Sequence, residues 1–196
     1  MDKQTEEILQ KIEEAEYVLV GLGQEFDMEF FLQSREDYRR IREQLQQQNV
    51  LWLLPYVEEQ FRRQYLPEME AEIEKGLQKL AKVLEKKSYF VVSSSLNHKL
   101  AEVPWKKMLL KKERFVAPCG DWTKKQCPDG CEEGIQTVTE ADEEQLQESF
   151  KKLQTNGFSV PDLGKCPKCG KKLVLNNVYA GRYDEKGYLK TWTEYQ

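Results

Sequence analysis

Four of the five cysteines fall into two close pairs, Cys127-Pro-Asp-Gly-Cys131 and Cys166-Pro-Lys-Cys169, and a glycine follows the second pair. Two thiolates separated by two or three residues can face one metal ion from a tight turn, and a second such pair completes the tetrahedral shell that zinc prefers. Disulfides within such short pairs would be strained. Because four thiolates fill the shell, the spacing predicts a closed, structural zinc site that does no chemistry itself.

The first candidate ligand site follows an apolar run, Tyr17-Val-Leu-Val20, which ends in Gly21-Leu-Gly23. A buried strand followed directly by G-x-G is how a nucleotide-binding βα unit begins. The third glycine of that fingerprint is missing, so a buried strand with a flexible exit explains the pattern equally well.

Two further apolar runs, 88–93 and 114–117, read as buried strands with polar exits. The first continues into Ser94-Ser95-Leu96-Asn97-His98, and the second into Pro118-Cys119-Gly120. Sheets of the α/β class bind ligands at the carboxyl ends of their parallel strands. His98 is the single histidine of the chain. We expect it to be a surface residue, as loop histidines usually are.

Helices must position these strands. Residues 28–86 predict a long helical segment, divided by prolines 55 and 67 that suit first turns. An aromatic cluster between residues 52 and 65 is expected to form packing core. Glu58, Glu59, Arg62 and Arg63 have i,i+4 spacing and predict a solvated helix face. Further helices are expected over 3–16 and 141–153, and a short strand over 173–175.

The composition excludes several classes of protein. The net charge is −4, with 33% charged and 39% hydrophobic residues, and no basic stripe favours nucleic acid as a partner. No apolar run approaches the ~20 residues that span a bilayer, and the acidic N-terminal stretch does not have the pattern of a signal peptide. Five cysteines, four of them assigned to metal, predict a reducing, cytoplasmic location.

The order of these motifs resembles a sirtuin from about residue 3 to about residue 180. The strand with G-x-G, the helical stretch, Ser93-Ser-Ser-Leu-Asn97, Cys119-Gly120 and the cysteine pairs carry the likeness. The cysteine spacing looks most similar to bacterial macrodomain-linked sirtuin-like proteins. The resemblance implies an NAD-dependent protein deacylase or ADP-ribosyltransferase. It places Gly21 and Gly23 at the pyrophosphate and Ser95 and Asn97 near the nicotinamide ribose, and it puts Cys119 at the catalytic histidine position, eight residues before Cys127.

Three departures from the family pattern predict that ordinary deacetylase activity is weakened or lost. Glu25 replaces the motif's serine and would bring a carboxylate beside phosphate oxygens. Ser95 and Asn97 replace an asparagine and an aspartate. Cys119 replaces the base, and an unperturbed thiol is mostly protonated at neutral pH. The alternative is a non-catalytic, zinc-stapled binding or interaction protein; a freestanding zinc ribbon is a third interpretation.

We therefore expect an α/β fold, with an incomplete Rossmann-like parallel sheet, a helical insertion and a small zinc-ribbon module. The predicted divisions are a core over 1–126 with its helical segment 28–86, a zinc module over 127–176, and the start of a return to the core over 177–196. The chain stops near where the family's remaining strands begin, which predicts an open sheet edge through which the protein could form an oligomer. The expected partner otherwise is a modified protein substrate.

Overall fold

The computed structural model describes residues 3–102, 114–131 and 134–187. Its first sheet is parallel and has the order β1-β2-β3, with β1 at Tyr17–Leu22, β2 at Ser88–Ser93 and β3 at Phe115–Val116. Tyr17 lies opposite Ser88, and Leu22 lies opposite Ser93. All three strands therefore end at the same edge of the sheet, where the polar exits follow.

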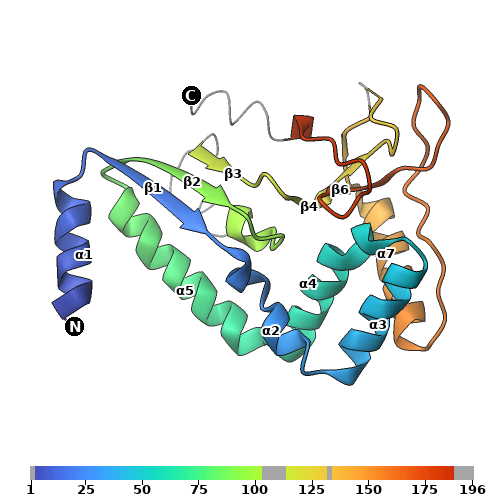
Figure 1. Cartoon of the computed structure of the whole chain (residues 1–196), viewed down its shortest axis with the longest axis horizontal. Helices are drawn as coiled ribbons and strands as arrows, with labels where there is room; N and C mark the ends of the chain where they lie inside the picture. The colour runs from blue at the N-terminus through green and yellow to red at the C-terminus, as the bar shows by residue number, and fades with distance from the viewer. Residues whose placement is uncertain (1–2, 103–113, 132–133, 188–196) are drawn as a thin grey trace.

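Helix α5 (Pro67–Leu84) runs along one face of this sheet, and α1 (Lys3–Glu14) stands near the start of β1 (Figure 1). Alternate residues of a strand point to opposite faces. Val18 and Val20 therefore pack toward the α5 core, whereas Tyr17 and Leu19 are 79% and 64% exposed. One face of β1 is thus covered and the other faces solvent.

A second, antiparallel sheet has the order β5-β4-β6, with β4 at Gly120–Gln126, β5 at Gln136–Thr137 and β6 at Val174–Asn177. It shares a large hydrophobic core with the helices α3 (Glu36–Gln47), α4 (Leu54–Tyr65) and α7 (Glu140–Gln154). Three short elements complete the described fold: η1 (Gln24–Asp27), α2 (Glu29–Leu32) and η2 (Leu51–Leu53).

Most predicted elements are present within a few residues of their expected bounds. The mixed α/β class, the small parallel sheet and the cysteine cluster are confirmed. Helices α2 to α5 fill the predicted helical segment. Helix α7 lies at the helix predicted between the two cysteine pairs, and β6 lies at the strand predicted after the second pair. Of the predicted return to the core, 177–185 form the end of β6 followed by turns and bends, 186–187 are helical, and 188–196 lie outside the described residues.

The core does not stop at the predicted start of the zinc module. Gln126 of β4 pairs with Val174 of β6, and Cys127 and Cys166 belong to the same hydrophobic cluster as Trp52. Packing around the cysteines therefore continues directly into the helices α3 and α4.

The predicted solvated face of α4 is wrong for three of its four residues. Glu58, Glu59 and Arg62 are 3%, 0% and 1% exposed, because α4 packs against α2, α3, α5 and β4 rather than lying at the surface. The expectation for His98 is also wrong, since its side chain is buried. In the described part of the chain, no helix has the length and apolar character needed to cross a membrane.

Candidate metal centre and ligand site

The four paired cysteines come together as the sequence predicts. The sulfurs of Cys127, Cys131, Cys166 and Cys169 all lie within 4.8 Å of one another, and the Sγ atoms of Cys127 and Cys169 are 3.5 Å apart. A tetrahedron of zinc–sulfur bonds of ~2.3 Å places sulfurs ~3.8 Å apart. The cluster could therefore hold a metal such as zinc.

Each cysteine pair lies in a tight turn closed by the backbone. The Gly130 N–H donates to the Cys127 carbonyl at 3.0 Å, and the Gly170 N–H donates to the Cys166 carbonyl at 2.9 Å. Both glycines have positive φ, 69° and 74°, which side chains with a Cβ rarely adopt. The glycine within the first pair and the glycine after the second thus allow the turns that aim two thiols at one point.

At the carboxyl edge of the parallel sheet, the polar residues gather around Asp27, which sequence reasoning missed. One carboxylate oxygen accepts hydrogen bonds from Ser95 Oγ at 2.6 Å, the Leu96 N–H at 2.8 Å and the Asn97 N–H at 3.1 Å. Burial raises the pKa of Asp27, and the Ser95 hydrogen bond and the charge of Arg62 partly offset that rise. Asp27 thus ties the exit of β2 to the connection that follows β1.

The predicted ribose-binding residues Ser95 and Asn97 therefore lie together, but their polar atoms already have protein partners. Asn97 donates through Nδ2 to the Phe26 carbonyl at 3.2 Å and accepts at Oδ1 from the Lys99 N–H at 3.2 Å. In the described structure, both residues organise the loop around Asp27.

The predicted pyrophosphate residues lie at the same edge. Gly21 is the fifth residue of β1, and Gly23 precedes η1. A Cβ on Gly23 would lie 2.1 Å from a carboxylate oxygen of Glu25. The space that this glycine provides is thus taken by an exposed acidic side chain, which a bound phosphate would have to displace.

Cys119 lies at the exit of β3, as the order of motifs predicts. Burial, and then the charge of Asp27, raise the pKa of its thiol, so the thiolate is even less populated at neutral pH than in an ordinary cysteine. Gly120, the next residue, has φ +70°, and a Cβ there would lie 2.2 Å from the Asn176 carbonyl oxygen. The glycine is needed for the close approach of β4 to β6.

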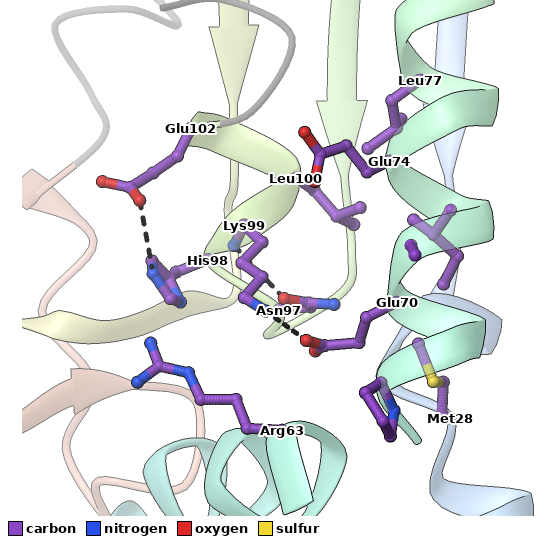
Figure 2. A pocket seen from close by; sticks show the side chains of 13 residues that line it. Met28, Arg63, Glu70, Glu74, Leu77, Asn97, His98, Lys99, Leu100 and Glu102 are labelled. Carbon is purple, nitrogen blue, oxygen red and sulfur yellow. Dashed lines mark hydrogen bonds and ion pairs between the residues drawn. The ribbon is translucent and has the colours of Figure 1, made fainter.

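Two cavities of about 370 Å³ and 380 Å³ open where the parallel strands end. The first lies between α5 and the exit of β2, and Figure 2 shows Asn97, His98 and Lys99 facing Glu70 of α5 and Arg63 of α4. The second extends past the exit of β3. Its lining includes Phe115, Ala117, Gly120 and Lys124.

His98 and Glu102 line both cavities. Behind His98 lies Glu59 of α4, whose Oε2 is 2.5 Å from His98 Nδ1. The Trp122 indole N–H donates to the same carboxylate, and the Arg63 guanidinium pairs with its other oxygen. Burial alone would raise the pKa of Glu59, but these partners hold it below its usual value. The sequence carried no signal for this contact beyond a lone histidine and a run of helix charges.

No family model matches the chain, and neither does any curated protein.

Proposed function

We propose that the protein is a zinc-stabilised, divergent sirtuin-like protein that binds NAD at the carboxyl edge of its parallel sheet and does not use Cys119 as a base. The observation that carries the proposal is the pair of cavities at the exits of β2 and β3, at the edge of a parallel sheet where α/β proteins bind their ligands. The cysteine cluster serves as a structural zinc site beside the core that β4 and β6 share with α3, α4 and α7.

The charges around the first cavity are mixed. Arg63 and Lys99 provide cationic groups that can approach phosphate oxygens, but each is paired with a glutamate, Arg63 with Glu59 and Lys99 with Glu70. Glu25 and Asp27 add negative charge at the G-x-G connection. Ligand phosphates must compete with these carboxylates, so we expect modest rather than tight affinity.

The direct test is calorimetric titration of the zinc-loaded protein with NAD. We expect binding with a Kd of about a millimolar or tighter, which corresponds to about 4 kcal/mol or more. Ala71 lines the first cavity from α5, so Ala71→Trp is expected to weaken binding by filling it. Ala141→Trp, at an exposed position of α7, is the matched control and should bind as the wild type does.

A second candidate function, a non-catalytic zinc-stapled interaction protein, is favoured by the hydrogen bonds around Asp27. The groups that would meet a cofactor, Ser95 Oγ and the Leu96 and Asn97 N–H groups, are satisfied without one. Absence of any binding heat with NAD in a folded, zinc-loaded sample would select this second function and rule out the first.

A further inference from the structure

His98 is held in one orientation by a buried carboxylate. Glu59 Oε2 lies 2.5 Å from Nδ1, and the histidine and glutamate side chains are 7% and 0% exposed. The Trp122 indole nitrogen lies 3.1 Å from the same Nδ1, and the two rings meet edge to face at 4.9 Å between centroids. A histidine packed in this way has little rotational freedom.

These contacts determine which ring nitrogen carries the proton. The partners of Glu59 favour its ionised form, and an ionised carboxylate only accepts hydrogen bonds. The Trp122 indole nitrogen only donates. Both the His98 Nδ1–H and the Trp122 indole N–H must therefore donate to Glu59 Oε2. The two nitrogens lie 3.1 Å apart because both point to this oxygen, and neither donates to the other. In the neutral ring, Nε2 then keeps its lone pair.

Nε2 is the end of the imidazole available to a ligand. The Glu102 Oε2 atom lies 3.6 Å from Nε2, which is longer than a hydrogen bond. The dashed line in Figure 2 marks this contact. His98 and Glu102 are the residues that the two described cavities share. A ligand extending from one cavity to the other would therefore pass over Nε2.

We propose that His98 is the catalytic proton acceptor of this site and that Glu59 is its positioning residue. The assignment rests on the proposed function, because it places NAD in the adjoining cavities. In the simplest reaction, a water oxygen bonds to the ribose carbon that carries nicotinamide, and nicotinamide leaves with the electron pair of the broken carbon–nitrogen bond. One proton of the water passes to Nε2, and ADP-ribose is the other product.

The role falls to His98 rather than Cys119 for a physical reason. An imidazole whose Nδ1–H donates to a carboxylate presents the lone pair of Nε2 as a proton acceptor, whereas burial and the charge of Asp27 raise the pKa of the Cys119 thiol. A carboxylate behind the ring orients it and stabilises the imidazolium that forms.

The first experiment uses the fact that the chain has a single histidine. Long-range nitrogen-15 NMR of the wild type then reports one imidazole without assignment. We expect the Nδ1–H tautomer in the free protein, a changed tautomer balance in Glu59→Gln, and shifted imidazole signals on saturation with NAD. The opposite tautomer in the wild type, or bound NAD that leaves the imidazole signals unmoved, would overturn the assignment.

The second experiment measures release of nicotinamide by chromatography alongside calorimetric NAD affinity. His98→Asn and His98→Gln are each expected to lower turnover by about 100-fold or more while Kd changes by less than about threefold. Glu59→Gln should lower turnover less and shift its pH profile, and Cys119→Ala should leave turnover unchanged.

The outcomes separate this inference from the function on which it rests. Wild-type turnover in both His98 variants, or NAD binding without any nicotinamide release by the wild type, overturns the proton-acceptor role and leaves NAD binding intact. Failure of the wild type to bind NAD overturns both. Because the NMR measurements on the wild type need no substitution, they remain decisive if a variant fails to fold.

Discussion

At the scale of single residues, the most consequential environment outside the cavities is that of Glu58. Glu58 lies on the buried side of α4, and its carboxylate accepts a hydrogen bond from the Tyr38 hydroxyl at 2.7 Å. Burial raises the pKa of Glu58 to about 7, against an ordinary value of 4.5, even though Tyr38 and Arg62 oppose the rise. The folded protein therefore holds this proton at pH values where the unfolded chain has released it.

This difference makes stability depend on pH. Because the folded pKa is the higher one, the contribution of Glu58 is fully present below pH 4.5 and is lost as pH rises toward 7. Glu58→Gln keeps an acceptor for Tyr38 and removes the titration. We expect the variant to be more stable than the wild type at pH 8 by up to about 3 kcal/mol, and similar to it near pH 5.

Urea unfolding at several pH values between 5 and 8 measures the effect. Zinc affinity also changes over this range, but it changes in both proteins, so the difference between them isolates Glu58. Glu144→Gln, at an exposed position of α7, should follow the wild type. Parallel curves for Glu58→Gln and the wild type would mean that the carboxylate does not titrate as its burial requires.

At the scale of elements, the two cysteine turns border the core that β4, β6 and α7 share with α3 and α4. Cys127 and Cys166 lie within the large core that also contains Trp52, Trp122 and Phe150. Four thiolates this close together repel one another unless a bound cation neutralises their negative charge. Without a metal, that cation is absent. The backbone hydrogen bonds still close each turn, but no metal–sulfur bonds then join the two turns to each other.

We expect one zinc per chain, and we expect its removal by a chelator to unfold residues 127–175 and to loosen the packing of α3 and α4. Near-UV circular dichroism should lose most of its signal, since the buried tryptophans share that core. Cys166→Ser should lose the metal. Cys119→Ser is the matched control, because Cys119 lies outside the cluster, and it should retain one zinc. A full near-UV signal after verified metal removal would contradict a structural role.

At the scale of the whole molecule, α5 covers one face of the parallel sheet, and β1 is the edge strand in the order β1-β2-β3 (Figure 1). Among residues 3–102, 114–131 and 134–187, β1 pairs only with β2, and it exposes Tyr17 and Leu19 beside its other edge. Unpaired strand edges with apolar side chains promote association with another chain. A second copy can pair with the same edge through a two-fold axis.

We therefore propose concentration-dependent self-association through β1. Light scattering after size-exclusion chromatography should detect a dimer in the wild type, and Leu19→Lys should shift it to monomer by placing a charge at the edge. Val160→Lys, at another exposed apolar position, tests whether added charge alone has this effect and should remain dimeric. A monomeric wild type at high micromolar concentration would exclude the β1 interface.

Features that depend on local spacing could be predicted from the order of the residues alone. The cysteine pairs needed only a tight turn each, and Gly130 and Gly170 provide it. Strand β2 followed from a continuous apolar run, because a buried parallel strand is apolar on both faces. The apolar run of β1 also predicted a strand, but the expected burial of both its faces is wrong, since Tyr17 and Leu19 face solvent. The position of Cys119 at a strand exit followed from the order of the motifs.

The contacts of the charged residues, in contrast, depend on how the elements pack in the folded protein. The i,i+4 spacing of charged residues indicates contacts within one helix but not what packs against that helix. For this reason the sequence predicted that Glu58 and Glu59 face solvent. The fold instead buries them and places Tyr38, Trp122 and His98, from three other segments, against their carboxylates. Contacts between residues so far apart in the chain arise from packing, which residue spacing does not encode. For this reason the metal site could be predicted from the sequence, whereas the Glu59–His98 pair could not.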